Sequence, residues 1–172
     1  GNKHFIEAQE HANVKFDDSM ACEKETIHST FYIARDDKLI GKICTADPIR
    51  PEAKETIKKI EDTGISTMLL SGDKQGVATV VGTELGIDEV YGNIFPDEKL
   101  AMIKKLQNEK NVVTVIGDGI NDAPALKQAD VGIAMGAMGM EPAIEAANIV
   151  LMTNDIQHVY YIYMLSCAMM RT

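Results

Sequence analysis

The sequence has 172 residues, 45% of them apolar and 25% charged, which is typical of a globular domain that buries its own core. Its net charge of −9 argues against a nucleic-acid-binding surface, which needs clustered Lys and Arg, so we expect no nucleic-acid partner. The three cysteines are far apart and form no CxxC pair, which favours reduced thiols over a zinc site or a disulfide framework.

The amino-terminal part of the chain differs from the rest in its polarity and in its hydrophobic periodicity. Residues 1–25 are polar and weakly periodic, and we expect a linker there. Residues 26–47, TIHSTFYIARDDKLIGKICTAD, predict an antiparallel hairpin of two strands joined at DDK. Beyond the hairpin, apolar strands alternate with amphipathic helices, so we assign residues 26–172 to a single domain.

The alternating part predicts an α/β fold. We expect helices at residues 50–64, 74–86, 96–110 and 121–129, and strands at residues 65–70, 89–92, 112–117, 131–135 and 148–152. In the first helix, Pro51 stands at the start, Ile57 and Ile60 share one face, and Gly64 marks the end. Alternation of this kind predicts a mostly parallel sheet with helices on both faces.

Two of these strands end in residues that could bind phosphate and metal. Ser71 follows one strand, Asp118 follows another with Asp122 four residues later, and Lys99 begins a helix between them. Ligands of parallel sheets bind beyond the carboxyl ends of the strands. A hydroxyl and a lysine can hold phosphoryl oxygens, and carboxylates suit Mg²⁺. The pattern predicts a site for phosphoryl transfer. This reaction also needs an acceptor for the phosphoryl group.

Each feature has an ordinary structural explanation when it is taken alone. SGD at residues 71–73 is a common turn, and Lys99 could be a solvated helix lysine. GDGIND at residues 117–122 is more specific, because two carboxylates and an Asn rarely crowd one turn without a cation. The prediction therefore depends on the combination, with each feature near the end of a strand.

Four stretches together resemble the phosphorylation domain of P-type cation-transporting ATPases, in the haloacid-dehalogenase-like superfamily: TADPIRPEAK, MLLSGDK, FPDEKL and GDGINDAPALKQADVGIAM. The run AIEAANIVLMTNDI is similar to the heavy-metal subgroup, the pumps for copper, zinc, cadmium and related ions. The resemblance implies a Rossmann-like haloacid-dehalogenase fold with Mg²⁺ and ATP as cofactors. It also implies a cytoplasmic domain of a membrane protein, with the pump's nucleotide-binding domain, actuator domain and membrane helices as partners.

By the same resemblance, individual residues take roles in the family's reaction. Ser71 matches the hydroxyl that binds the transferred phosphoryl group, and Lys99 matches the lysine that neutralises it. Asp118 matches a Mg²⁺ ligand, and Asn121 and Asp122 match residues that support the metal and phosphoryl site.

Further residues match the rim of the site. Gly72 and Asp73 belong to SGDK, where the family more often has TGDN, and Asp47 lies on the same expected rim. GNKHFI looks like the last part of the subgroup's nucleotide-binding domain. That match would make residues 1–25 the tail of this domain and Asn2 a contact to ATP.

One departure from the family affects the expected activity. The family's phosphate acceptor is an aspartate in a strand ending DKTGT, and this sequence contains no such stretch. Asp47 and Asp17 are poor substitutes, because both fail the spacing of that motif. Since aspartyl phosphate formation needs this nucleophile, we expect the carboxyl part of a longer pump, inactive on its own. By resemblance the missing strand lies between the strands ending at Ser71 and Asp118, so we expect that gap to be filled or closed.

Alternatives remain open from the sequence. A soluble phosphatase of the same superfamily and a non-catalytic module that binds Mg²⁺ and phosphate fit the same residues. MGAMGM at residues 135–140 is either a thioether site for a soft metal or, in our preferred interpretation, a glycine-rich connection between a strand and a helix. Residues 156–170 carry no formal charge and are too short to span a bilayer, which predicts a buried helix or, by resemblance, a stalk helix.

Overall fold

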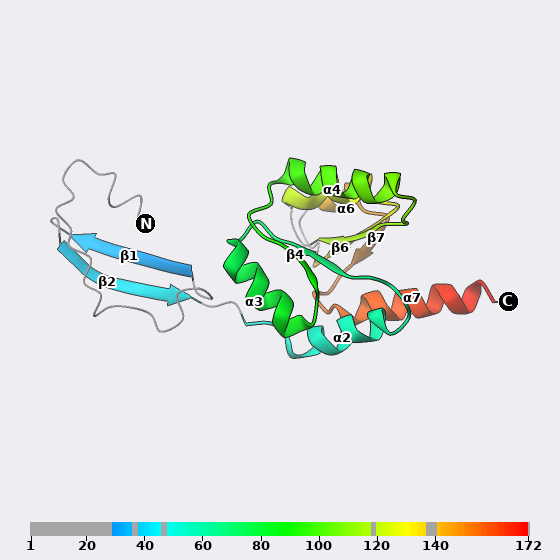
Figure 1. Cartoon of the computed structure of the whole chain (residues 1–172), viewed down its shortest axis with the longest axis horizontal. Helices are drawn as coiled ribbons and strands as arrows, with labels where there is room; N and C mark the ends of the chain where they lie inside the picture. The colour runs from blue at the N-terminus through cyan, green and yellow to red at the C-terminus, as the bar shows by residue number, and fades with distance from the viewer. Residues whose placement is uncertain (1–28, 36–37, 46–47, 118–119, 137–140, 172) are drawn as a thin grey trace. The chain divides into compact units, whose positions relative to one another are not determined.

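The computed structural model describes residues 29–35, 38–45, 48–117, 120–136 and 141–171 (Figure 1). The chain divides after Ile49 into two compact units. The domain boundary that we expected between residues 25 and 26 lies outside the described residues and stays a prediction.

The first unit contains the expected hairpin. Strands β1 (Ser29–Arg35) and β2 (Lys38–Thr45) pair antiparallel, with Phe31 opposite Ile43. The side chains of these two residues are about half exposed. A two-stranded hairpin with such apolar exposure is at best marginally stable alone.

The second unit alternates helices and strands, as the sequence predicts. Its elements in chain order are α2 (Pro51–Glu61), β3 (Met68–Leu70), α3 (Gln75–Leu85), β4 (Glu89–Tyr91), α4 (Pro96–Asn108), β5 (Thr114–Gly117), the 3₁₀ turn η2 (Ile120–Asp122), α5 (Ala123–Gln128), β6 (Val131–Met135), α6 (Glu141–Ala146), β7 (Ile149–Leu151) and α7 (Gln157–Met169). Strands β3 and β5 begin later than we expected, and α6 follows the segment that we interpreted as a glycine-rich connection.

The first helix shows how local sequence produces these elements. Pro51 occupies the first position of α2. A backbone N–H at this position has no partner within the helix, so proline, which lacks an N–H, loses no hydrogen bond there. Ile57 and Ile60 are buried on one face of the helix, as predicted. After the helix, Gly64 has a φ of +89°, a conformation that glycine adopts without a steric penalty.

Strands β5, β6 and β7 form a parallel sheet with β6 in the middle and helices on both faces (Figure 1). On one face, Ile133 of β6 packs with Ile60 of α2 and Val159 of α7. On the other face, the next residue, Ala134, packs with Leu126 of α5. Successive β6 side chains therefore enter two different clusters, which confirms the predicted two-faced coverage.

The parallel strands form two sheets. Strands β3 and β4 pair with each other, and β3 does not pair with β5. The sheet has therefore not closed across the position at which we expected the missing acceptor strand. Within β5, Ile116 is 39% exposed, whereas the last residue, Gly117, is buried. The alternative that the amino-terminal segment fills the position of the missing strand stays a prediction, because residues 1–28 lie outside the described part of the chain.

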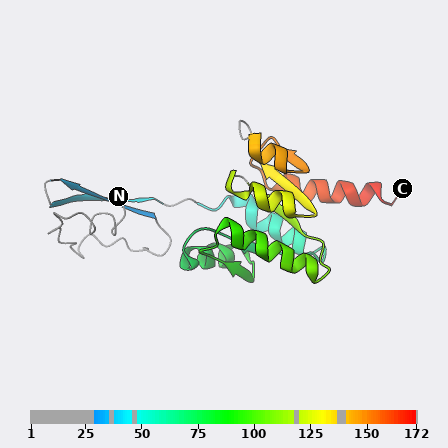
Figure 2. The same ribbon diagram turned by 90° about the horizontal axis from the view of Figure 1, so that it is seen from above.

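Helix α7 lies against α2 and then extends beyond the rest of the second unit (Figures 1 and 2). Val159 is buried near its start, whereas Leu165 and Met169 towards its end are largely exposed. The predicted carboxyl-terminal helix is confirmed, but it is buried only in part. In the described part of the chain, no helix is both long and apolar enough to cross a membrane.

Candidate functional site

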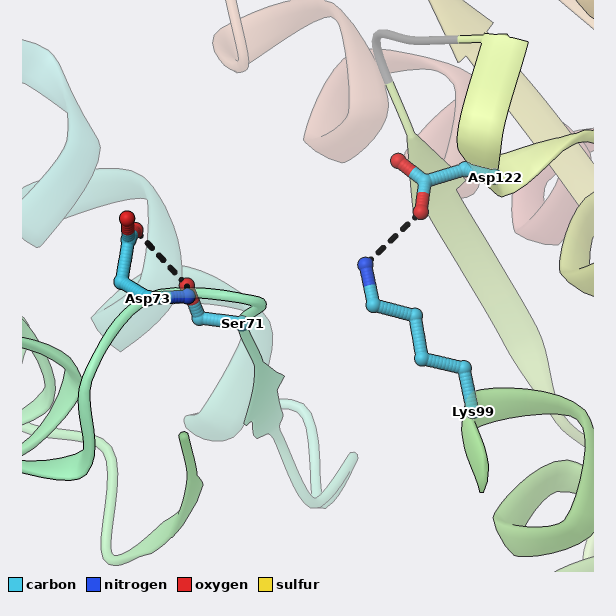
Figure 3. A network of polar contacts seen from close by, with 4 residues as sticks. All are labelled: Ser71, Asp73, Lys99 and Asp122. Carbon is cyan, nitrogen blue, oxygen red and sulfur yellow. Dashed lines mark hydrogen bonds and ion pairs between the residues drawn. The ribbon is translucent and has the colours of Figure 1, made fainter. Parts of the chain in front are cut away.

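Lys99 and Asp122 form an ion pair at the carboxyl end of β5. The Lys99 Nζ atom lies 2.8 Å from Asp122 Oδ1, and each side chain is only 19% exposed (Figure 3). Lys99 lies in the first turn of α4, where Glu98 accepts a hydrogen bond from the Phe95 N–H at 2.8 Å and so caps the helix. Lys99 is therefore held by a capped helix start, and Asp122 lies immediately before the first residue of α5.

The Asp122 side chain lies against the last residue of β5. A Cβ atom placed on Gly117 would lie 2.8 Å from Asp122 Cβ and 3.1 Å from Asp122 Oδ2. Gly117 is buried, so no such atom could turn away into solvent. The first glycine of GDGIND thus makes room for the carboxylate.

Ser71 and Asp73 form a second polar pair, at the end of β3. The Ser71 hydroxyl donates to Asp73 Oδ2 at 2.9 Å, and the Asp73 N–H donates back to Ser71 Oγ at 3.1 Å (Figure 3). These two bonds fix the hydroxyl oxygen over the turn. The pair is more exposed to solvent than Lys99 and Asp122.

A cavity of about 370 Å³ is lined by residues that follow strands of both sheets. Its lining residues are Gly72, Asn93, Ile94, Phe95, Pro96, Lys99, Asn121 and Asp122. Of the residues predicted from the sequence, the structure brings Gly72, Lys99, Asn121 and Asp122 to this cavity. Ser71 and Asp73 flank Gly72 without lining the cavity themselves. Asn2, Asp47 and Asp118 lie outside the described residues, so their predicted roles remain predictions.

Sequence reasoning did not identify the loop that leads into α4. Asn93 and Phe95 line the cavity, and the Phe95 side chain is 71% exposed. Asn93 has a φ of +55°, a conformation in which Asn is enriched among non-glycine residues. The sequence GN before an apolar pair could have indicated a turn, but nothing in it indicated proximity to Lys99.

The described residues fit one side of a Mg²⁺ site. Asp122 and Asn121 line the cavity and carry hard oxygen atoms, the type of ligand that Mg²⁺ prefers, and this ion commonly retains several waters. Among the residues that the structure describes, no group of three or more His, Cys, Asp or Glu side chains could hold a metal.

A separate network fixes the opposite ends of α4 and α5. The Gln107 amide donates to the Gln128 carbonyl oxygen at 3.0 Å and to Asp130 Oδ2 at 3.2 Å. The Val113 N–H also donates to Asp130 Oδ2, at 2.8 Å. This backbone hydrogen bond, followed by that of Gln107, holds the pKa of the Asp130 carboxyl below its ordinary value. Asp130 therefore has a structural role in the described chain.

The comparisons with known proteins agree with the resemblance seen in the sequence. The family model of the haloacid dehalogenase-like hydrolases matches residues 1–130. The chain is 43% identical over 144 residues to the zinc-transporting ATPase of Bacillus subtilis and 44% identical over 153 residues to the copper-exporting P-type ATPase B of Archaeoglobus fulgidus. These alignments cover 84% and 89% of this chain but only 22% of each relative.

The fold agrees with a solved structure as well. A zinc-transporting PIB-type ATPase in its E2.Pi state superposes with a TM-score of 0.72 and 32% sequence identity. The superposition covers 84% of this chain and 24% of the transporter. The chain thus spans about a quarter or less of the larger proteins that it matches.

Proposed function

We propose that this chain supports Mg²⁺-dependent phosphoryl transfer from ATP within a longer pump. The chain belongs to the haloacid dehalogenase-like hydrolase family and corresponds to the phosphorylation-domain region of heavy-metal P-type ATPases. The phosphoryl acceptor in this proposal is an aspartate in another part of that pump. The single observation that carries the proposal is the ion pair of Lys99 and Asp122. Both residues line a cavity that is also lined by Gly72 and Asn121.

Lys99 is proposed to bind and neutralise the transferred phosphoryl group. Its ammonium group has three N–H donors, and the ion pair with Asp122 occupies one of them. The remaining donors can point into the cavity without breaking the pair. Because the side chain is only 19% exposed, its charge is less screened by solvent than that of a surface lysine.

Ser71 is proposed to donate a hydrogen bond to a phosphoryl oxygen. The Asp73 N–H holds Ser71 Oγ in place, so the hydroxyl hydrogen can rotate from the Asp73 carboxylate to a phosphoryl oxygen without moving the oxygen atom. Preorganised donors of this kind lower the cost of charge that develops during the reaction.

Asp118 and Asp122 are proposed to hold Mg²⁺, with Asn121 supporting the metal and phosphoryl site, and ATP is proposed to be the phosphoryl donor. When bound, the metal would neutralise charge on phosphoryl oxygens. In the proposed pump this region lies on the cytoplasmic side of the membrane, with the nucleotide-binding domain, the actuator domain and the membrane helices as partners. The cargo is proposed to be a heavy-metal cation, a class that includes the zinc and copper of the two relatives.

Phosphorylation by radiolabelled ATP tests the proposal. A longer polypeptide that adds the upstream acceptor strand should give an acid-stable, hydroxylamine-sensitive label, and the 172-residue chain alone should give none, because it lacks the attacking carboxylate. Hydroxylamine-sensitive label on the chain alone would direct attention to Asp47 or Asp17. Turnover of p-nitrophenyl phosphate by the chain alone would instead support a soluble phosphatase, and tight binding without turnover a regulatory module.

A further inference from the structure

The loop after β3 and the loop after β4 are joined by a series of backbone hydrogen bonds. The Ser71 N–H donates to the Tyr91 carbonyl oxygen at 2.9 Å, and the Ile94 N–H donates to the Ser71 carbonyl oxygen at 3.0 Å. The Asn93 N–H donates to the Asp73 carbonyl oxygen at 2.6 Å. These bonds continue the parallel pairing of β3 and β4 into the loops at the cavity.

The side chain of Gln75 extends this series by one step. Its Oε1 accepts a hydrogen bond from the Gly92 N–H at 2.6 Å, and its Nε2 donates to the Val90 carbonyl oxygen at 3.2 Å. The amide thus pairs with both backbone groups of the strand end, as a neighbouring peptide would. Gly92 permits this close approach, because a Cβ there would lie 2.5 Å from Gln75 Cα.

The segment that Gln75 holds leads directly to the proposed phosphoryl site. Asn93, Ile94 and Phe95 line the cavity, and Lys99 follows in the first turn of α4. On the other side, Gln75 begins α3 immediately after the Ser71 turn. The side chain therefore lies at the junction between the segment bearing the hydroxyl and the segment bearing the lysine.

We propose that Gln75 is a positioning residue, which holds the loop at residues 91–95 in register with the Ser71 turn so that Lys99 and Ser71 can bind the same phosphoryl group. This inference depends on the proposed function of those two residues. Displacement of a binding group by about 1 Å is enough to lower its effectiveness strongly. The backbone hydrogen bonds of this junction do not depend on side chains and so remain after a substitution. The hydrogen bonds of the Gln75 amide can be removed by a substitution, which makes the role of Gln75 testable.

The test uses the 172-residue chain with Gln75→Met, which keeps the length of the side chain and removes both hydrogen bonds to the strand end. Thr79→Val is the matched control, since the Thr79 hydroxyl also contacts Gln75 Nε2, at 3.2 Å, but lies within the same helix. The first measurement is amide hydrogen exchange by NMR at Gly92, Asn93 and Ile94. Exchange should accelerate in Gln75→Met and not in Thr79→Val.

The second measurement is a titration with inorganic phosphate in the presence of Mg²⁺, followed through the side-chain signals of Lys99. We expect the dissociation constant to rise about 2- to 10-fold in Gln75→Met, the range for loss of a neutral hydrogen bond, and to stay unchanged in Thr79→Val. Faster exchange with an unchanged dissociation constant would overturn the positioning role alone. Unchanged exchange in Gln75→Met would overturn the structural basis of the inference. No phosphate-dependent shift in the unaltered chain would overturn the proposed function and this inference with it.

Discussion

Lys99 and Asp122 pair at 2.8 Å although 23 residues separate them in the sequence. The pair joins the first turn of α4 to the start of α5, and Gln107 joins the same two helices near their other ends through the Gln128 carbonyl oxygen. Lys99 and Gln107 therefore both reach α5, or the residue immediately before it, from opposite ends of α4. The position of the lysine is thus set by the packing of two helices as well as by the loop before it.

Replacement of Lys99 by Met should abolish most phosphorylation in a longer polypeptide that carries the acceptor strand. We expect a decrease of about 100-fold or more, the usual effect of removing a group that stabilises developing charge. The rate of labelling by radioactive ATP measures it. Lys104→Met, at an exposed position of the same helix, is the control and should leave the rate unchanged. Equal rates for the two variants would remove Lys99 from the proposed site.

Replacement of Gly117 by Ala should displace the Asp122 carboxylate, because the new Cβ would lie 2.8 Å from Asp122 Cβ in a buried position. We expect a loss of about 1–3 kcal/mol in the free energy of unfolding, measured with urea. Gly76→Ala is the matched control, since Gly76 is helical and a Cβ placed there would meet no atom of another element within 4 Å. That change should stabilise the chain by about 0.5–1 kcal/mol. A neutral effect of Gly117→Ala would show that Asp122 moves aside at no cost.

Replacement of Asp118 by Asn should weaken Mg²⁺ binding in the presence of a phosphate analogue much more than replacement of Asp130 by Asn. The reason is that Asp118 is the proposed ligand, while the Asp130 carboxylate already accepts hydrogen bonds from Val113 and Gln107. Calorimetric titration with Mg²⁺ and beryllofluoride, on a longer polypeptide that carries the acceptor strand, distinguishes the two variants. Equal losses of affinity would contradict the assignment of Asp118.

Asp130 should contribute to stability at neutral pH and not in strong acid. Its hydrogen bond from the Val113 N–H, and then that from Gln107, lower its pKa in the folded state. The contribution is therefore complete above the pKa of the unfolded chain and is lost as the pH falls through the lower, folded pKa. Urea unfolding of the unaltered chain and of Asp130→Asn should differ at about pH 7, and the difference should shrink as the pH falls below the unfolded pKa of about 4. A difference that persists unchanged in acid would show that the carboxylate charge is unimportant.

Several features followed from local sequence, because the interactions that produce them lie within one element. The start of α2 at Pro51 and the burial of Ile57 and Ile60 needed only helical periodicity. The positions of Ser71 and Lys99, at a strand end and in the first turn of a helix, needed only the alternation of strands and helices.

Strand pairing did not follow from the pattern in the same way. Alternation indicates that parallel strands exist, but hydrogen bonds between strands depend on which neighbours are present. In this chain β3 pairs with β4, and β5 pairs with β6, while β3 and β5 do not pair. The mostly parallel sheet expected from the sequence therefore occurs as two sheets.

The sequence by itself determined the class of fold and the chemical types gathered at the strand ends: a hydroxyl, a lysine, carboxylates and an amide. Only the tertiary structure decided which of them meet. It paired Lys99 with Asp122, placed Ser71 with Asp73 instead, and brought Asn93 and Phe95 to the cavity. The physical reason is that periodicity and capping act over a few residues, whereas these contacts depend on the packing of α4 against α5 and on hydrogen bonds between two loops.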